Sequence, residues 1–517
     1  MAKRKRQSPA AQPRFSPQLP TTEGSDGTNG PADTSPEQHW SAKVLARLLA
    51  PVDIASLAVF RVCFGLALAW DVWGFLRLGL VNLYWVDPLF HFTFLGFDWV
   101  QPWQGLGMYV HFLVLLLLAL CIAAGLFYRL ATILFFPAFA YVLLLDKAYY
   151  LNHFYLITLI SFLLIFVPAH RCFSLDALRN TKLRSDTTPA WTVWVLSGQL
   201  AIVYFFGGVA KLRWDWLVLG EPMRTFLVAA SPPPGMGPLL TSEAAVYFFA
   251  WGGALFDLAI PFLLWMPRTR AVAYTTVVGF NLCNAFFFEI GIFPWFMICA
   301  STLFFRPDWP RRIGWVWMLP PRTDRRQRTA TTDSSGFASM GFGRRAVLMV
   351  MTVYFVIQLT LPFSQYFYPG NVLWRHEPAY FIWHMKLATS ATETHIVAKD
   401  PSTGEEYDVD PRIHLNAKQI RKFRTNPDML LQYAHFLARQ AQDNGIPNLE
   451  VRAQVRSSLN RRPPRMFVYP DVNLAEVERS MSPVAFLYPL ETAPLAEKPL
   501  RKAAELSETE NTDTADP

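Results

Sequence analysis

The sequence predicts an all-α, multi-pass membrane domain of about nine spans, followed by a soluble, exported α+β domain. Composition is the first reason: 52% of the 517 residues are hydrophobic, 17% are charged and the mean hydropathy is +0.21, which is too apolar for a soluble chain of this length. Stretches of about 20 apolar residues, enough to cross a membrane, also recur as far as Pro362. Beyond Pro362 the sequence has the mixed charge of a water-soluble domain.

Residues 1–40 form a basic N-terminal segment that differs from the apolar sequence after it. The basic run 3–6 leads into Ser, Thr, Pro and Gly with hardly any large apolar side chain, so we predict that this segment is disordered. No apolar stretch directly follows the basic run, which argues against a cleavable signal peptide. We expect the helix that begins near Val52 to be the first insertion signal, with the N-terminus in the cytoplasm.

The transmembrane catalytic domain is predicted to occupy residues 44–362. Its apolar stretches lie at 54–76, 106–127, 130–146, 149–168, 189–210, 243–266, 271–289, 291–305 and 346–362. Lys and Arg gather after the second, fourth, sixth and eighth stretches, and such basic loops stay on the cytoplasmic side. This alternation predicts nine crossings with the C-terminus outside the cytoplasm, and it places His153 and Lys211 at the same non-cytoplasmic face.

The exported domain is predicted to span residues 363–498, with a loose tail at 499–517. Strand-like pieces at 395–399 and 465–469 and a helical piece at 428–438 indicate an α+β fold. All five cysteines lie in or beside predicted spans, so this domain cannot hold a disulfide. The chain has no Asn-x-Ser/Thr acceptor, which favours a bacterial inner membrane over the endoplasmic reticulum.

Composition and motifs exclude several function classes. The net charge of +8 owes much to the basic start and to the loop 306–345, which face anionic lipid, so we expect membrane lipid and no nucleic acid as a partner. No His-x-x-x-His or Cys-x-x-Cys pair occurs, and we therefore expect no metal. The phosphate-binding loops of nucleotide-dependent enzymes and pumps are also missing.

Lys211 is the strongest candidate for a catalytic residue. It follows an apolar helix in which Gly207 and Gly208 would let another helix or a flat ligand approach the backbone. Surroundings of low dielectric favour the neutral amine, and a neutral lysine is a usable general base. The structural alternative is that Lys211 extends to the membrane interface or pairs with Asp215 on the next turn.

A second polar interruption holds Asn152 and His153. His153 is either an acid or base or a hydrogen-bonded structural group, and Asn152 is a neutral donor or acceptor with the same two interpretations. Just before them, Asp146 and Lys147 are interpreted most simply as a locally neutralised pair that closes the third span.

Several strings in this chain, in their order and spacing, resemble the vitamin K-dependent γ-carboxylase family with its HTTM-type membrane domain, over about residues 44 to 490. The strings are Leu143-Leu-Leu-Asp146-Lys147 through Asn152-His153-x-Tyr155-Leu156; Ala169-His170-x-x-x-Ser174-Leu-Asp176; Tyr204-Phe-x-x-Gly208-Val-x-Lys211-Leu-x-x-Asp215-Trp216; Asn284 with Ile290-Gly291-Ile-Phe293; Pro307-x-Trp309-Pro310; Leu361-Pro362-Phe-Ser364; and Asp428-Met-Leu-x-Gln432-Tyr433-Ala434.

The resemblance implies an integral-membrane enzyme that uses reduced vitamin K, O2 and CO2 to convert glutamate in a protein or peptide to γ-carboxyglutamate, while forming vitamin K epoxide. It implies that Lys211 is the base toward the hydroquinone and that His153 is a second catalytic residue. The residues expected to bind substrate or quinone are Asn152, Asn284, Tyr204 and Gly208.

Three other functions remain open from the sequence. One is a quinone epoxidase without carboxylation, since bacterial relatives share the membrane domain without necessarily sharing that activity. Another is a non-catalytic scaffold that binds quinone or lipid, which would tolerate Lys211→Ala apart from a modest change in stability. A transporter is the third, but the chain shows no inverted repeat and its polar residues gather at one face.

Overall fold

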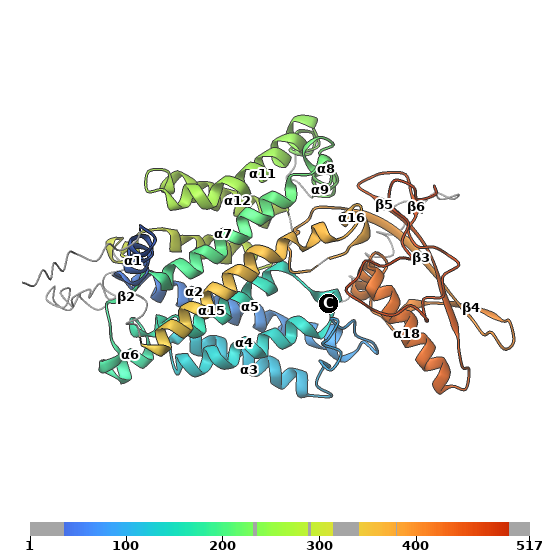
Figure 1. Cartoon of the computed structure of the whole chain (residues 1–517), viewed down its shortest axis with the longest axis horizontal. Helices are drawn as coiled ribbons and strands as arrows, with labels where there is room; N and C mark the ends of the chain where they lie inside the picture. The colour runs from blue at the N-terminus through green and yellow to red at the C-terminus, as the bar shows by residue number, and fades with distance from the viewer. Residues whose placement is uncertain (1–35, 231–234, 288–290, 314–340, 379, 496–517) are drawn as a thin grey trace, which may run out of the picture.

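The computed structural model describes residues 36–230, 235–287, 291–313, 341–378 and 380–495. A helical bundle extends to Thr360 and a smaller sheet-containing domain lies at one end of it (Figure 1). The helices of the bundle are α1 (Pro36–Leu49), α2 (Ala55–Arg77), α3 (Gly107–Ala124), α4 (Tyr128–Leu145), α5 (Asn152–Phe166), α6 (Leu175–Arg179), α7 (Trp191–Lys211), α8 (Trp214–Leu217), α9 (Met223–Ala229), α10 (Gly237–Leu240), α11 (Glu243–Trp265), α12 (Arg270–Phe287), α13 (Phe293–Ala300), α14 (Trp309–Arg312) and α15 (Phe342–Thr360).

The predicted N-terminal segment and C-terminal tail lie outside the described residues, except that 36–40 form the start of α1. Two short strands, β1 (Pro51–Asp53) and β2 (Thr187–Pro189), pair antiparallel beside the N-terminal ends of α2 and α7.

Each of the nine predicted apolar stretches contains a helix in the described part of the chain. Six helices are long and apolar enough to cross a membrane: α2, α3, α4, α7, α11 and α15 with the 3-10 turn that follows it. Two shorter apolar helices, α5 and the segment Phe293–Phe304, correspond to two further stretches, and α12 to the last. The structure therefore confirms a mostly helical domain with six candidate spans, whereas the count of nine crossings stays a prediction.

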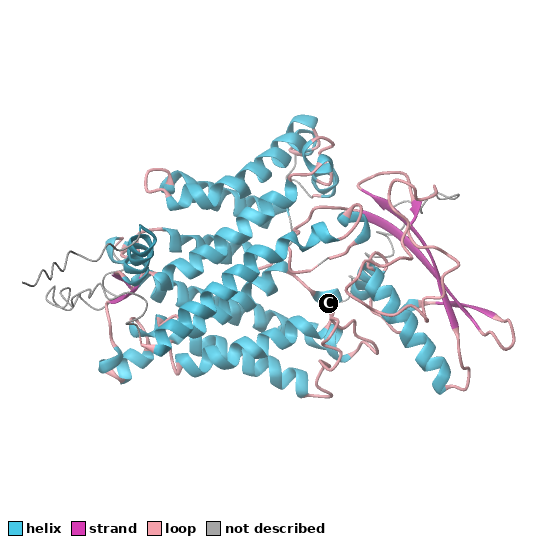
Figure 2. Cartoon of the chain, viewed as in Figure 1, coloured by secondary structure: helices cyan, strands magenta, loops and turns pink. Residues whose placement is uncertain are grey.

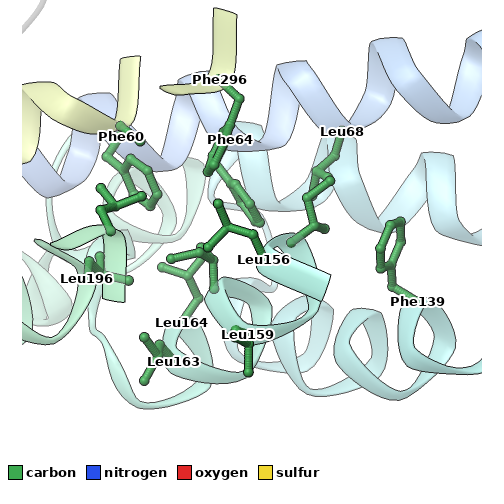
Figure 3. Close-up of a cluster of buried hydrophobic side chains, with 14 of the residues drawn as sticks. Phe60, Phe64, Leu68, Phe139, Leu156, Leu159, Leu163, Leu164, Leu196 and Phe296 are labelled. Atoms are coloured by element: carbon green, nitrogen blue, oxygen red, sulfur yellow. The ribbon is translucent and has the colours of Figure 1, made fainter. Parts of the chain in front are cut away.

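The bundle is held by one apolar core that α2 shares with its neighbours (Figure 3). Gly65 allows α2 to lie against α3, because a Cβ at this position would be 2.5 Å from the backbone nitrogen of Ala123. On the same helix, Phe60 and Phe64 pack against Phe296 of α13, with ring centroids 6.5 and 5.9 Å apart. These contacts hold α2, α3 and α13 together in the bundle.

The C-terminal domain is a four-stranded antiparallel sheet with helices against it (Figure 2). The strand order is β4-β3-β5-β6. The elements are α16 (Val372–Arg375), β3 (Ser390–Lys399), β4 (Glu406–Val409), α17 (Ala417–Phe423), α18 (Pro427–Asp443), β5 (Glu450–Leu459) and β6 (Arg465–Met466). Buried residues alternate along β5, as in a strand with one face on a core, and α18 packs on it.

The helix predicted at 428–438 and the strand at 395–399 are confirmed by α18 and β3. Only the first two residues of the piece 465–469 form a strand, and Val468 adds an isolated bridge to Leu487. The prediction of an α+β domain is thereby confirmed, while its exported location stays a prediction.

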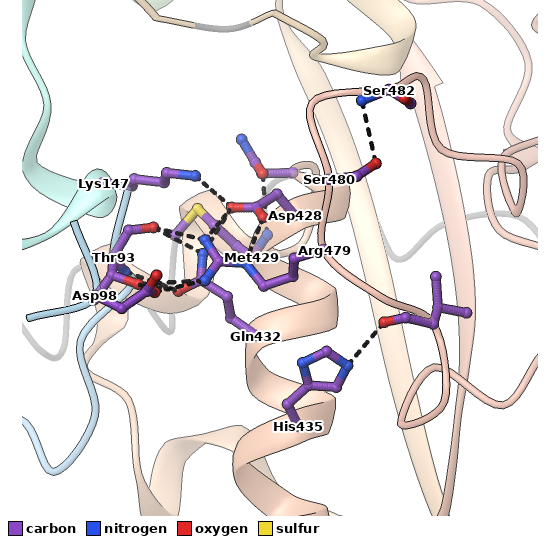
Figure 4. Close-up of polar contacts among 12 residues, drawn as sticks. Thr93, Asp98, Lys147, Asp428, Met429, Gln432, His435, Arg479, Ser480 and Ser482 are labelled. Atoms are coloured by element: carbon purple, nitrogen blue, oxygen red, sulfur yellow. Dashed lines mark hydrogen bonds and ion pairs between the residues drawn. The ribbon is translucent and has the colours of Figure 1, made fainter. Parts of the chain in front are cut away.

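A polar network joins the two domains (Figure 4). Lys147 of the membrane domain pairs with Asp428 at the start of α18, and Arg479 bonds both Asp428 and Asp98 at 2.8 Å. The predicted local pair of Asp146 with Lys147 is therefore wrong. The backbone turns between the two residues, and the Asp146 carboxylate faces Gln419 of α17 instead, at 2.8 Å.

Asp215 forms a second polar link between the domains. Arg462 donates to both of its carboxylate oxygens at 2.6 Å, and Asn460 adds a bond of 2.7 Å. Around these contacts, one apolar cluster contains Trp216 of α8 and Phe423 of α17 together, so the two domains share a core.

Candidate active site

A cavity of about 1160 Å³ lies between the membrane domain and the C-terminal domain. Its membrane wall comes from α2, α5, α7, α8, α9, α11, α12 and α13. Its other wall comes from α17 and from residues 376, 380 and 384–386. Aromatic rings line much of it, including Phe75, Phe226, Phe256, Phe280 and Phe293. Single ligands typically occupy pockets of about 300–1,000 Å³, so this volume has room for a flat apolar ligand and part of a second one.

Lys211 lies in this cavity at the end of α7, where it is 7% exposed. Its Nζ donates to the Asp257 carboxylate of α11 at 2.5 Å and to the Gly207 carbonyl oxygen at 3.2 Å. The Trp216 ring lies 5.5 Å from the same ammonium group. The predicted alternative pairing with Asp215 is wrong, because that carboxylate points to the C-terminal domain and binds Arg462.

The paired glycines of α7 make the Lys211–Asp257 contact possible. A Cβ on Gly208 would lie 2.7 Å from the backbone nitrogen of Leu258, and one on Gly207 would meet the Met385 side chain at 2.8 Å. Helix α11 can therefore approach α7 closely enough for Asp257 to reach Lys211. Gly208 itself packs against α11, outside the cavity lining.

His153 and Asn152 begin α5 and both line the cavity. The His153 ring contacts Phe154 and Phe293, with centroids 5.0 and 6.0 Å apart, and among the described residues neither ring nitrogen has a hydrogen-bond partner. Asn152, by contrast, has a hydrogen-bond partner: its side-chain amide donates to the His384 carbonyl oxygen at 2.8 Å. His153 thus keeps two nitrogens available to a ligand, whereas Asn152 ties α5 to the opposite wall.

Tyr204 and Asn284 also face the cavity. The Tyr204 hydroxyl contacts the Ser301 hydroxyl at 3.2 Å, and its ring packs edge-on against Phe256. Asn284 lies one turn after Asn281, whose amide donates to a backbone carbonyl of its own helix at 2.9 Å. Five of the six predicted site residues therefore line one cavity. The sixth, Gly208, contacts α11 and allows this helix to lie close to α7.

The C-terminal domain contributes two neutral histidines to the opposite wall. Burial lowers the pKa of His376 to about 4 and that of His384 to about 3, so both imidazoles are uncharged at neutral pH. His384 Nε2 lies 3.1 Å from the side-chain oxygen of Gln365, so Nε2 carries the proton and Nδ1 stays an acceptor.

Lysines line the same wall: Lys386 before β3, and Lys418 and Lys422 on α17. Burial lowers the pKa of Lys418 to about 8, with repulsion from Lys422 and Arg421 acting in the same direction. Burial also lowers the pKa of Lys422, as do the nearby charges of Arg421 and Lys386. The wall contributed by the C-terminal domain therefore carries three lysine side chains.

Sequence reasoning missed Asp257 and the lysines of α17. A signal existed for Asp257, because a carboxylate inside the apolar stretch 243–266 is costly unless it is paired or functional. No comparable signal existed for Lys418 and Lys422, since lysines four residues apart in a polar helix are typical of a solvated surface.

The arrangement can move a proton next to an apolar ligand. The Lys211–Asp257 ion pair is buried in surroundings of low dielectric, where desolvation penalises both of its charges. The pair can offer a neutral amine as a proton acceptor, or an ammonium group as the counter-ion of an anion. The aromatic lining and the buried ion pair together fit a hydroquinone, which is flat, apolar and weakly acidic.

Two family models match the chain. The HTTM domain matches residues 49–309, which is half of the chain, and the vitamin K-dependent gamma-carboxylase, lumenal domain, matches residues 343–493. No solved structure matches the chain significantly. The first match covers the bundle from α2 to α13, and the second covers α15 and the sheet domain. The two walls of the cavity therefore come from the two matched regions. The chain belongs to the vitamin K-dependent γ-carboxylase family and is an integral membrane protein.

Proposed function

We propose that this protein is a vitamin K-dependent γ-glutamyl carboxylase-like enzyme. It converts glutamate in a protein or peptide to γ-carboxyglutamate and couples this to epoxidation of reduced vitamin K, with O2 and CO2 as co-substrates. The observation that carries the proposal is the Lys211–Asp257 pair, buried in a cavity that both matched regions line.

Reduced vitamin K, when bound, supplies the hydroquinone whose reaction with O2 drives the carboxylation. Lys211 acts as the base toward the hydroquinone hydroxyl, which titrates in the phenol range near pH ~10 and so matches an amine in strength. Asp257 orients Nζ across 2.5 Å and takes up the proton that Lys211 must release to become neutral. Neighbouring rings, including Trp216 at 5.5 Å, exclude water from this exchange.

The remaining site residues have supporting roles. His153 serves as a second acid or base within the cavity, since neither of its ring nitrogens has a hydrogen-bond partner among the residues that the structure describes. Tyr204, Asn284 and Asn152 present polar groups to the quinone or the peptide, and Gly208 acts through the contact between α7 and α11.

We further propose a bacterial inner-membrane location with the C-terminal domain on the non-cytoplasmic side. The alternation of basic loops along the sequence supports this orientation, and so does the description of the second matched domain as lumenal.

The test is product analysis with purified protein in detergent, reduced vitamin K, bicarbonate and a glutamate-containing peptide. The native chain is compared with Lys211→Ala and with Lys399→Ala, a control whose lysine lies in β3 and pairs with Glu406 at 3.8 Å. We expect epoxide and carboxylated peptide from the native chain and the control. Loss of the base lowers the rate about 10²- to 10⁴-fold in Lys211→Ala.

Epoxide without carboxylated peptide would replace the proposal with a quinone epoxidase. If the folded protein forms neither product, a non-catalytic binding scaffold would replace the proposal. Full activity in Lys211→Ala would show that the lysine is not the base.

A further inference from the structure

A second, smaller cavity adjoins the main one between two helices of the membrane domain. Its volume is about 330 Å³, and it lies between α2 and the start of α13. We call it the α2–α13 cleft. Besides four residues that it shares with the main cavity, its lining consists of Trp70, Trp73, Arg77, Ile292 and Trp295. The chemistry proposed for Lys211 gives this cleft no role.

Only a thin partition separates the cleft from the main cavity. The four residues that line both spaces are Asp71, Gly74, Leu78 and Gly291. Asp71, Gly74 and Leu78 are three and seven residues apart, so they follow one face of α2. Gly74 has no side chain, and a Cβ at this position would meet no atom of the described residues within 4 Å. The cleft is therefore a continuation of the main cavity.

The packing of α2 on α13 leaves room for the cleft at one end only. Near the first half of α2, Phe60 and Phe64 contact Phe296, and the cleft lies along the second half, from Trp70 to Leu78. Residue Phe293, next to the cleft on α13, lines the main cavity, and its ring centroid lies 6.0 Å from that of His153. The cleft thus meets the main cavity close to a candidate catalytic residue.

Tryptophans surround the outer end of the cleft. Trp70, Trp73 and Trp295 are 65%, 48% and 55% exposed, and exposed rings on a membrane bundle contact lipid. Tryptophan is enriched where a span meets the lipid headgroups, and arginine is common just beyond the end of a span. Arg77 is the last residue of α2. The cleft therefore opens to lipid near the membrane interface, away from the junction of the two domains.

Asp71 places a carboxylate at the partition. Its Oδ2 is buried and has no hydrogen-bond partner among the residues that the structure describes. A buried acceptor without a donor is costly, and a carboxylate inside a span is costly as well. A hydroxyl group on a ligand would supply the missing donor. Asp71 therefore favours a ligand that is mostly apolar but carries hydroxyl groups, which describes a hydroquinone.

We propose that the α2–α13 cleft is the passage through which the hydroquinone enters the main cavity from the lipid. The inference rests on the proposed function and adds the route to it: the ring passes Gly74 and Asp71, and the apolar side chain of the ligand stays in the cleft between the tryptophans. A volume of about 330 Å³ is at the lower end for a ligand site, so the cleft holds part of a ligand.

The experiment measures how fast a ligand reaches the cavity, without turnover. Two methylnaphthohydroquinones are compared in the absence of O2. One carries a long isoprenoid chain and is confined to micelles, and the other has no chain, dissolves in water and need not pass through lipid. Each is mixed rapidly with the full-length protein in neutral detergent. Quenching of tryptophan fluorescence gives the association and dissociation rates, and a titration gives Kd.

The variants Gly74→Ala, Gly74→Leu and Gly74→Phe place side chains of increasing size in the open space of the partition. A narrowed passage slows entry and exit alike, so both rates of the long-chain ligand should fall together, by about tenfold in Gly74→Phe, while Kd changes little. The ligand without a chain should keep its rates. The control Gly343→Phe adds the same side chain in open space on α15 and should leave both ligands unaffected. Thermal unfolding of each variant establishes that it is folded.

Unchanged association of the long-chain ligand in folded Gly74→Phe would overturn the inference. Equal slowing of both ligands would also overturn it, because the effect would then not depend on entry from lipid. A weaker Kd with an unchanged association rate would assign Gly74 to the binding site and would reject the passage as well. If entry depends on Gly74 as expected but the protein forms neither epoxide nor carboxylated peptide, the passage stands and the proposed function alone fails.

Discussion

The Lys211–Asp257 pair makes a quantitative prediction about stability and activity. The two side chains are 9% and 6% exposed, and Nζ lies 2.5 Å from the carboxylate. Removal of one partner of such a buried pair leaves an uncompensated charge, which costs about 3–5 kcal/mol. We therefore expect Lys211→Met and Asp257→Asn each to lower the free energy of unfolding by about that amount at neutral pH.

The double variant Lys211→Met/Asp257→Asn should regain most of the loss, because no unpaired charge stays buried. A double-mutant cycle from denaturant unfolding in detergent should then give a coupling free energy of several kcal/mol, far above the ~0.5 kcal/mol expected for independent sites.

Activity should separate from stability in the same set. Both variants that lack Lys211 should lose about 10²- to 10⁴-fold in the rate of hydroquinone epoxidation, including the stable double variant. Asp257→Asn should lose about 10²-fold, since the amine remains but is no longer held in place. A coupling free energy near zero would refute the pairing, and an active double variant would refute the role of Lys211.

Three further predictions concern packing, the chemistry of His153 and topology. Gly208→Ala should lower the free energy of unfolding by about 1–3 kcal/mol and should also lower the rate of epoxidation, because the added Cβ meets the backbone of Leu258. The control Gly343→Ala, whose Cβ lies in open space on α15, should lower neither quantity. Unfolding and rate measurements check both expectations. His153→Phe should keep the fold and lower epoxidation, and an unchanged rate would exclude His153 from the chemistry. Protease should reach the C-terminal domain only from the non-cytoplasmic side, so its digestion in sealed inside-out vesicles would contradict the topology.

Much of the fold is determined by local pattern. Apolar stretches long enough to cross a membrane marked α2, α3 and α7 to within a few residues, and amphipathic periodicity marked α18. The number of crossings was harder to predict, because α5 and α13 are short and apolar on all sides, and length alone does not separate a buried helix from a span.

The candidate site was predictable in its residues but not in its contacts. Lys211, His153, Asn152, Tyr204 and Asn284 do line one cavity, as their family positions implied. Their partners lie far away in sequence: Asp257 is 46 residues from Lys211, and Asp428 is 281 residues from Lys147. Such pairs are fixed by tertiary packing, so a rule based on neighbouring residues selected Asp215 and Asp146 instead.

The shared core between the two domains limits how this protein could be divided. Trp216 and Phe423 belong to the same apolar cluster, and Asp215 is bonded twice by Arg462 across the junction. A C-terminal domain produced alone would expose that cluster to water and leave Arg462 without its carboxylate, which favours aggregation. A chimera that joins this membrane domain to the C-terminal domain of a relative would need matching residues at both positions. The two regions are therefore expected to be inherited and to change together.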